Sequence, residues 1–285
     1  MRQDADFVLR IASEDRKGIV AAVANTIVGQ DCNIVESAQF GDPDSGRFFM
    51  RVAFKAPDGM TADAFSRGFE AAAQTFNLDW QLHDLNKKLR AMIMVSQGGH
   101  CLNDLLYRTS TRRLPMEVTS IVSNHTTWQR RAEHEGVPFF HLPVTPDNKL
   151  EQEAQLLAMI DEQQVDLVIL ARYMQVLSDQ VCRKLDGRVI NIHHSFLPGF
   201  KGAKPYHRAH ERGVKMVGAT AHYVTPDLDE GPIIAQDVSI VDHADTVDAL
   251  IAQGQDTESR VLARAVKLHL EHRIMLNGNR TVVFK

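Results

Sequence analysis

The chain has 285 residues, enough for two domains of ordinary size, and a formal net charge of −4 at pH 7. This charge excludes a polycationic face, so no nucleic-acid partner is expected. The first residues lack the apolar core of a secretory signal and no stretch approaches the length of a membrane span, so we expect no membrane partner and a cytoplasmic protein. The three widely spaced cysteines, Cys32, Cys101 and Cys182, indicate reduced thiols, which fits that compartment.

Residues 1–86 predict a small first domain with the element order βαββαβ. Strands are expected at 7–12, 32–40, 47–55 and 80–85, and helices at 15–29 and after the N-cap Thr61. Each helix has an apolar face, formed in the first by Ile19, Val23 and Ile27 and in the second by Phe65, Phe69, Ala72 and Phe76. This order is typical of the ferredoxin-like arrangement. A hinge at 86–90 leads into a second domain, 87–285.

The second domain predicts strands alternating with helices, which favours an α/β fold with a doubly wound, mainly parallel sheet. Short, continuously apolar runs predict strands buried on both faces at 92–95, 118–122, 137–142, 167–170 and 189–192. Further strands are expected at 217–224 and 233–241, and helices at 150–163 and 246–272. Asn277-Gly278 predicts the turn of a terminal hairpin.

Polar side chains gather where the strand at 189–192 ends. Asn191 and His193 are two residues apart, so both leave the same face of the strand, and Pro198, Gly199 and Gly202 predict an irregular loop after them. An amide and an imidazole at the carboxyl end of a strand can stabilise an oxyanion and move a proton. Asp229 supplies a carboxylate for such a pair. Each residue also has a structural interpretation, as a hydrogen-bonded histidine, an asparagine cap or a turn aspartate.

Several motifs carry a resemblance to a known family. Asn191-Ile-His193, Ser195-Phe-Leu-Pro198 with Lys201-Gly202, the run 218–224 and the run 228–234 are similar to the signature of the folate-dependent formyltransferase fold. The run 171–178 is similar to the loop that holds the pterin ring in those enzymes, and the run 15–20 resembles an ACT domain. The two domains in this order, with the runs 99–106 and 193–198, resemble the formyltetrahydrofolate deformylase family over essentially the whole chain.

The resemblance implies hydrolysis of 10-formyltetrahydrofolate to formate and tetrahydrofolate, which supplies formate for purine biosynthesis and balances one-carbon pools. The folate is the substrate, and no permanently bound cofactor is expected. Asn191 is expected to donate to the oxyanion, His193 to move a proton, and Asp229 to orient the imidazole and position the water. By the same resemblance, the folate-binding positions are Leu170, Arg172, Met174, Val176, Leu177, Cys182, Val189 and Thr225, although ordinary core packing also explains the apolar ones.

The loop after the strand at 92–95 departs from the transferases of the formyltransferase fold. They carry a Ser-Gly-x-Gly-Ser-Asn loop that cradles a ribose phosphate, whereas this chain has Gly98, Gly99, His100 and Cys101 at its end. The two glycines still allow an anion nest with His100 at the helix start. The loss of the Ser-Asn pair favours water over a phosphate-bearing amine as acceptor.

Two other functions compete with hydrolysis. One is a folate-dependent formyltransferase that acts on a glycinamide-ribonucleotide-like amine, and the other is a ligand-sensing module that has lost its activity. The adjacent residues His193 and His194 could in principle bind one metal ion together. Neighbouring residues on a strand point to opposite faces, however, so no metal site is predicted.

The ACT resemblance implies a regulatory or oligomerisation domain. Its expected amino-acid effector positions are Asp15, Gly18 and Asn33. Because one face of a βαββαβ sheet is left uncovered by helices, we expect it to be buried against a copy of itself, in a homodimer or homotetramer. A purely structural dimerisation domain is the alternative.

Overall fold

The computed structural model describes residues 5–197 and 205–285 and divides the chain into two compact units. The first unit runs to Lys88 and includes Glu271–Met275 and Val282–Lys285, and the second comprises Leu89–Leu270 and Leu276–Thr281. The predicted division at residue 86 assigns both C-terminal segments to the second domain, whereas here they group with the first unit. The predicted loop residues Pro198, Gly199, Lys201 and Gly202 lie outside the described residues.

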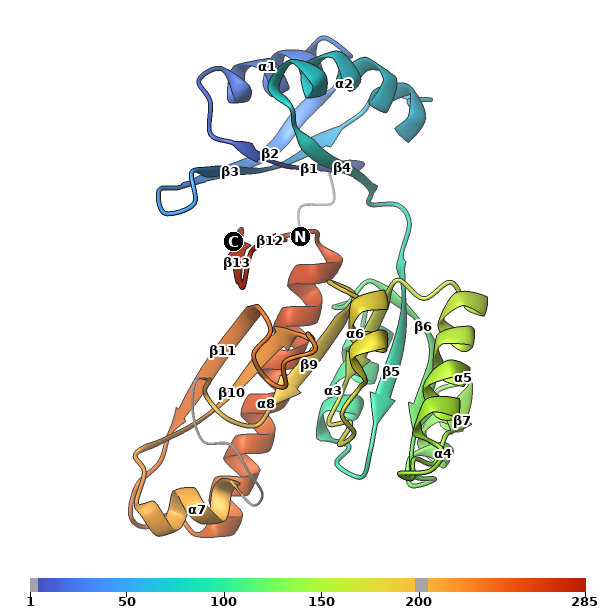
Figure 1. Ribbon diagram of the computed structural model, residues 1–285, viewed down its shortest axis with the longest axis vertical. Helices are drawn as coiled ribbons and strands as arrows, with labels where there is room; N and C mark the ends of the chain where they lie inside the picture. Colours follow the sequence, from blue (N-terminus) through green and yellow to red (C-terminus); the bar gives the residue numbers. More distant parts are fainter. Residues whose placement is uncertain (1–4, 198–204) are drawn as a thin grey trace. The chain divides into compact units, whose positions relative to one another are not determined.

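The first unit is an antiparallel four-stranded sheet with two helices. Its strands have the order β2-β3-β1-β4, which confirms the ferredoxin-like prediction (Figure 1). The elements are β1 Phe7–Glu14, α1 Ile19–Val28, β2 Asn33–Asp42, β3 Arg47–Lys55, α2 Ala62–Phe76 and β4 Asp79–Asp84.

The two helices cover one face of this sheet. The buried residues of α1 are the predicted Ile19, Val23 and Ile27, and Thr61 caps α2 as predicted by accepting a hydrogen bond from the backbone of Ala64. Two details of the prediction are wrong. Helix α1 begins at Ile19, because Gly18 has a φ of 98°, which helical residues do not adopt. The third buried residue of α2 is Ala73 and not Ala72, because the inward stripe continues from Phe69 at a spacing of four.

The other face of the sheet carries residues from the C-terminal segments of the same unit. Met275 and Phe284 pack with Ala12 and Phe49, which are partners in the β1–β3 register. The expectation that this face is left for a second copy is therefore wrong for this part of the face.

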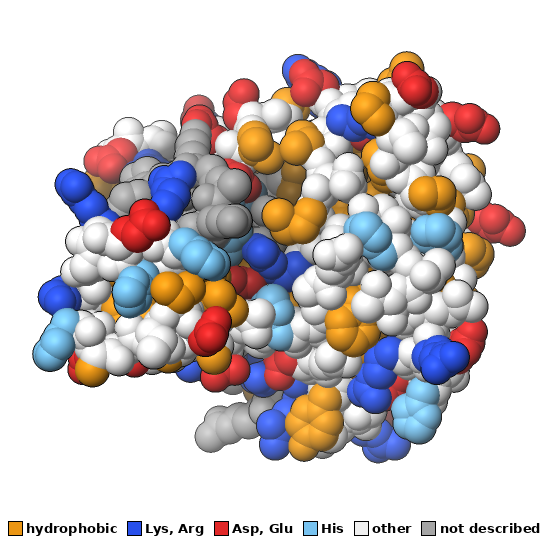
Figure 2. Space-filling model, turned by 90° about the horizontal axis from the view of Figure 1, so that it is seen from below, with side chains coloured by type: hydrophobic (Ala, Val, Ile, Leu, Met, Phe, Trp, Pro, Cys, Tyr) orange, Lys and Arg blue, Asp and Glu red, His pale blue; other side chains and the backbone are white. Residues whose placement is uncertain are grey.

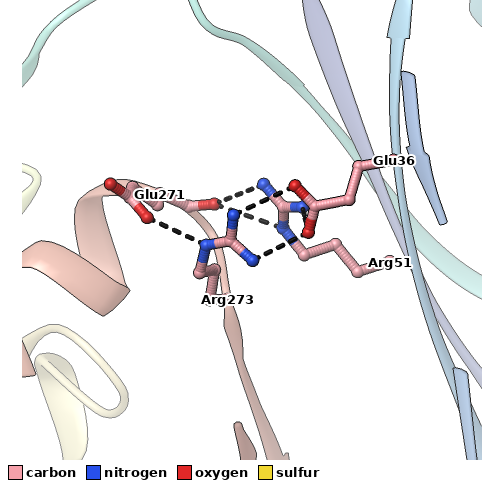
Figure 3. A network of polar contacts seen from close by, with 4 residues as sticks. All are labelled: Glu36, Arg51, Glu271 and Arg273. Carbon is pink, nitrogen blue, oxygen red and sulfur yellow. Dashed lines mark hydrogen bonds and ion pairs between the residues drawn. The ribbon is translucent and has the colours of Figure 1, made fainter. Parts of the chain in front are cut away.

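A polar network joins the C-terminal segment Glu271–Met275 to the sheet (Figure 3). Arg273 donates to both carboxylate oxygens of Glu36, at 2.8 and 3.0 Å, and Arg51 donates to Glu36 at 3.1 Å. Arg51 also donates twice to the backbone oxygen of Glu271, at 3.3 and 3.0 Å. Burial and the charge of Arg273 lower the pKa of Arg51 to about 10, so both guanidinium groups are charged at pH 7 and share the Glu36 carboxylate as an acceptor.

The second unit is built on a seven-stranded sheet of order β11-β10-β9-β8-β5-β6-β7. Pairs from β9 to β7 are parallel, whereas β10 is antiparallel to both β9 and β11. The strands are β5 Leu89–Val95, β6 Met116–Ser123, β7 Phe139–His141, β8 Leu167–Leu170, β9 Val189–His193, β10 Met216–Tyr223 and β11 Ile233–Ile240. The mixed, mostly parallel α/β sheet confirms the predicted fold class, although the strand expected at 137–142 is limited to three residues.

Helices cover both faces of this sheet. They are α3 His100–Ser110, α4 Gln129–His134, α5 Lys149–Glu162, α6 Asp179–Lys184, α7 Pro205–Arg212 and α8 Val247–Leu270, followed by the hairpin strands β12 Ile274–Asn277 and β13 Arg280–Val283. Helices α5 and α6 enclose a core with alternate residues of the strands, such as Val168, Leu170 and Val189. Asn191 and His193 follow Val189 at intervals of two residues. Their side chains therefore lie on the same face of the sheet as this core, beyond its apolar part. In the described part of the chain, no helix combines the length and apolarity that a bilayer span requires.

The first prediction concerns Glu36. Replacing Glu36 by Gln leaves two neighbouring guanidinium groups without their common anion. We expect the free energy of unfolding to fall by about 1 to 3 kcal/mol, less than the roughly 3–5 kcal/mol for breaking a fully buried pair, because the side chain of Glu36 is 37% exposed. Urea denaturation at pH 7 measures the change.

The matched control is Glu14→Gln. Glu14 also pairs with an arginine, Arg16, but its side chain is 77% exposed. Such a surface pair contributes roughly 0–1 kcal/mol. Equal unfolding midpoints for the two variants would show that the network in Figure 3 does not stabilise the first unit.

Candidate active site

A cavity of about 230 Å³ lies in the second unit at the carboxyl end of β8 and β9. Asn191, His193 and Asp229 all line it, although Asp229 is remote from the other two in sequence. The parallel strands of this unit finish toward the bottom of Figure 1, and Figure 2 shows the molecule from that side, with histidine, hydrophobic and charged side chains all exposed on this face. The structure therefore brings the three predicted catalytic side chains to one cavity.

A direct contact joins His193 to Asp229. The Nδ1 of His193 lies 3.2 Å from the Oδ2 of Asp229, and both side chains are largely buried. The hydrogen bond from His193 and the ring of His222, whose Nε2 lies 3.7 Å from Oδ1, lower the pKa of Asp229 well below its usual range, so this carboxylate is ionised and can only accept. Nδ1 of His193 therefore carries the proton that it donates, and in the neutral ring the lone pair is on Nε2.

His222, which the sequence analysis did not single out, completes the group. It lies opposite Asn191 in the β9–β10 register, and the Nδ2 of Asn191 is 3.2 Å from its Nε2. Its Nδ1 is 2.9 Å from the backbone oxygen of Tyr223, so Nδ1 donates there, and Nε2 of the neutral ring accepts from Asn191. This contact orients the amide and leaves its second N–H for a ligand. The antiparallel pairing of β9 with β10, which the sequence did not predict, would have identified His222.

The turn that carries Asp229 has a constrained backbone. Asp229 has a φ of 58°, in the left-handed region that aspartate and asparagine tolerate better than most residues. Two residues on, a Cβ at Gly231 would lie 1.8 Å from the backbone oxygen of Tyr223. Glycine at this position therefore lets the turn pack against β10, and this packing holds Asp229 beside His193.

A second buried cluster lies next to the cavity and centres on Glu258 of α8, which is 1% exposed. Its carboxylate accepts hydrogen bonds from Nε2 of His100 at 2.8 Å and from the hydroxyl of Tyr206 at 2.7 Å. It also forms an ion pair with Nε of Arg172 at 3.3 Å. Burial opposes ionisation, but the hydrogen bond from His100, the charge of Arg172 and the hydrogen bond from Tyr206 together lower the pKa of Glu258. Arg172 also lines the cavity, so this cluster fixes one wall of it.

The loop at residues 98–100, expected to form an anion-binding nest, is instead filled by contacts within the chain. His100 contacts Glu258, and a Cβ on Gly99 would lie 1.9 Å from the ring of Trp128, so this glycine allows the indole to pack closely. Among the described residues, His100, Cys101 and Glu258 form the one group of potential metal ligands that lie near one another. The carboxylate of that group is already bonded to Arg172, His100 and Tyr206.

The side chains of His193 and His194 lie on the same side of the chain, contrary to the expectation from strand alternation. Their rings stack with centroids 4.8 Å apart and planes 24° apart, so they do not point to opposite faces. The reason is that β9 ends at His193, and the alternation of a strand does not extend to His194.

Seven of the eight predicted folate positions line the cavity. They are Leu170, Arg172, Met174, Val176, Leu177, Cys182 and Thr225. The exception is Val189, which is 1% exposed and packs in the core under α5 and α6. The backbone explains this, because Val189 is at the start of β9 and the cavity is at its end. Met174 and Val176 are 59% and 53% exposed, so their apolar side chains are available to a ligand.

Comparison with known proteins identifies relatives along the whole chain. Residues 89–266 match the Formyl transferase family. The chain is 49% identical to a formyltetrahydrofolate deformylase of Corynebacterium sp. (strain P-1) and 45% identical to one of Synechocystis sp. (strain ATCC 27184 / PCC 6803 / Kazusa), with at least 99% of each chain covered.

Solved structures give the same result. The crystal structure of a formyltetrahydrofolate deformylase from Burkholderia mallei ATCC 23344 matches with a TM-score of 0.94 and 50% identity, covering 99% of this chain and 100% of that one. A glycinamide ribonucleotide transformylase from Symbiobacterium toebii is more distant, with a TM-score of 0.65 and 32% identity over 70% of this chain and 95% of that one.

The second prediction concerns the pH dependence of stability at Asp229. Replacing Asp229 by Asn keeps a residue that tolerates positive φ but removes the charge that His193 and His222 contact. We expect a loss of about 1.5 to 3 kcal/mol in the free energy of unfolding at pH 7. Because the pKa is lower in the folded chain, the wild-type advantage is present above the unfolded-state pKa, about 3.9. This advantage of the wild type disappears as the pH falls toward the pKa that Asp229 has in the folded chain.

Urea denaturation of both proteins between pH 7 and pH 3 measures this difference. The control is Asp227→Asn, since Asp227 is an exposed residue of the same turn. A wild-type advantage that stays constant through pH 3, or that the control shares, would contradict a lowered pKa of Asp229 in the folded chain.

Proposed function

Since the chain belongs to the formyltetrahydrofolate deformylase family and hydrolyses 10-formyltetrahydrofolate, we propose that Asn191, His193 and Asp229 carry out this hydrolysis. The observation that supports the assignment most strongly is that the amide, the imidazole and the carboxylate line one cavity. The enzyme is a hydrolase that acts on a C–N amide bond and releases formate and tetrahydrofolate. A role for this formate in purine biosynthesis is part of the proposal.

In the first step, water adds to the formyl carbon. A C–O bond forms, the carbonyl electron pair moves onto oxygen, and Nε2 of His193 takes a proton from the water. The free N–H of Asn191 donates to the negative oxygen, and Asp229 stabilises the imidazolium through Nδ1. His222 supports this step by holding the amide in orientation.

In the second step, the tetrahedral intermediate collapses. The C–N bond breaks, the electron pair of the oxyanion re-forms the carbonyl, and the proton on His193 goes to the departing folate nitrogen. Formate loses the remaining proton to solvent. The apolar and half-exposed side chains of Met174 and Val176 provide contact area for the folate ring system. We propose that no permanently bound cofactor takes part.

The third prediction is that purified protein releases formate from 10-formyltetrahydrofolate when no amine acceptor is present. Asp229→Asn should bind the folate but lose most turnover, and Asn191→Ala should lose about 100- to 1,000-fold in kcat, as expected for one oxyanion donor. A coupled formate assay measures both, and fluorescence titration measures folate binding.

Asp227→Asn serves again as the control and should keep wild-type turnover. If no formate appears and tetrahydrofolate is released only when an added amine nucleotide precursor takes up the formyl group, the chain is a transferase instead of a hydrolase. Full activity of Asp229→Asn would remove Asp229 from the mechanism.

For the first unit we propose a regulatory role through self-association and an amino-acid effector. Val20 and Val28 of α1 and Phe40 of β2 are large apolar side chains that are exposed in the single chain, which supports an interface through a helix or a strand edge. The expected effector positions Asp15 and Gly18 lie in the loop before α1. Asn33, the third such position, begins β2. The three free, buried cysteines support the further proposal of a reducing, cytoplasmic compartment.

The fourth prediction is that the full chain sediments as a dimer or tetramer at micromolar concentration. Val28→Glu should shift the equilibrium toward monomer, whereas Val238→Glu is the control, since Val238 is an exposed residue of the second unit. A monomer at all concentrations would contradict the self-association proposal. An unchanged sedimentation coefficient and unchanged turnover with each of the common amino acids would contradict the effector proposal.

A further inference from the structure

Two nitrogen atoms of the cavity residues have no hydrogen-bond partner among the described residues. They are Nε2 of His193 and Nε2 of His194, and both are buried. A buried polar atom without a partner typically costs about 1–3 kcal/mol. The proposed mechanism uses the first of these atoms as a base, but it gives the second atom no role.

The contacts of Arg172 determine what His194 can do. Nη1 of Arg172 lies 2.8 Å from Nδ1 of His194, and a guanidinium has only donors, so Nδ1 accepts. The proton of the neutral ring is therefore on Nε2. Burial and the charge of Arg172 lower the pKa of His194 to about 4, so the ring is neutral at pH 7. His194 thus presents one N–H donor that cannot be exchanged for a lone pair without losing the contact to Arg172.

Arg172 is itself held in place by buried groups. Its Nε contacts the Glu258 carboxylate, and its backbone oxygen accepts from Ser96 at 3.1 Å. Its φ of 64° is unusual for a residue other than glycine, which indicates a position fixed by its surroundings. The order of contacts is therefore Glu258 to Arg172 to His194, and it ends at the unpartnered N–H.

The two unpartnered nitrogens are complementary. Nε2 of neutral His193 is an acceptor, because its Nδ1 donates to Asp229, whereas Nε2 of His194 is a donor. Their rings stack with centroids 4.8 Å apart. A water molecule can accept from one partner and donate to another at the same time, so one donor and one acceptor on two stacked rings are the pair of groups that a single bridging water needs.

We propose that His194 is a positioning residue that holds the nucleophilic water through its Nε2–H while His193 accepts a proton from that water. The water then has one lone pair bound by His194, one hydrogen directed at His193 and its second lone pair free for the formyl carbon. Glu258 and Arg172 act through His194 by keeping its donor on Nε2. This inference rests on the proposed hydrolysis and adds how the acceptor water is selected.

The fifth prediction separates this role from a structural one by offering a second nucleophile. His194→Phe keeps a ring that can stack on His193 but removes the donor. Its kcat for hydrolysis should fall about 100-fold, the scale expected from a misplaced reactant, and its KM for the folate should change less than about threefold. Added hydroxylamine does not need the held water. The ratio of formylhydroxamate to formate should therefore rise at least about tenfold over wild type, after correction for the uncatalysed reaction.

A conservative variant and a control complete the experiment. His194→Gln offers an N–H near the same place and should recover part of the hydrolysis and lower the ratio again. His134→Phe, at an exposed histidine of α4, should match wild type in both products. Thermal unfolding and folate titration of each variant show whether it is folded and binds.

The outcomes distinguish the two proposals. A wild-type protein that releases no formate overturns the hydrolase function, and this inference with it. A wild type that releases formate while His194→Phe keeps its kcat overturns the inference alone. An equal loss of formate and formylhydroxamate in the folded, folate-binding variant also overturns it, because His194 would then serve both nucleophiles, for example as a second oxyanion donor.

Discussion

The hydrogen bond from His193 to Asp229 is the interaction on which the site depends. It fixes which nitrogen of His193 has the lone pair, and it keeps the carboxylate ionised. It also requires the turn at Asp229, which has a left-handed backbone and packs through Gly231 against β10, to lie beside the end of β9. Sheet topology, turn conformation and proton position are thus parts of one arrangement.

The second constraint is the buried carboxylate of Glu258. A charge with 1% exposure is stable only when its partners are in place, and here His100, Tyr206 and Arg172 come from three separate segments. A Cβ at Gly254, one turn before Glu258, would lie 2.2 Å from the Tyr206 ring, so glycine is required for this tyrosine to reach the carboxylate. The cluster therefore joins α3, α7 and α8 to the wall of the cavity and supports the hydrolytic site.

The first unit uses a related principle for a structural purpose. Glu36 accepts from two guanidinium groups, and the same C-terminal segment that carries Arg273 contributes Met275 to the apolar contact with Ala12 and Phe49. The chain thus returns to its first unit after helix α8 of the second. This covers part of a sheet face that the βαββαβ pattern by itself leaves open.

The sequence by itself determined the element order and the ferredoxin-like sheet of the first unit, the strands of the second unit and the placement of Asn191 and His193 on one face, because these follow from local periodicity and from the pleat of a strand. It did not determine the pairing of β10 with β9, and so it missed His222. It also did not place Glu258, which lies 158 residues from His100, or the stacking of His193 on His194. These depend on contacts between distant segments and on where a strand ends, and only the tertiary structure decides them.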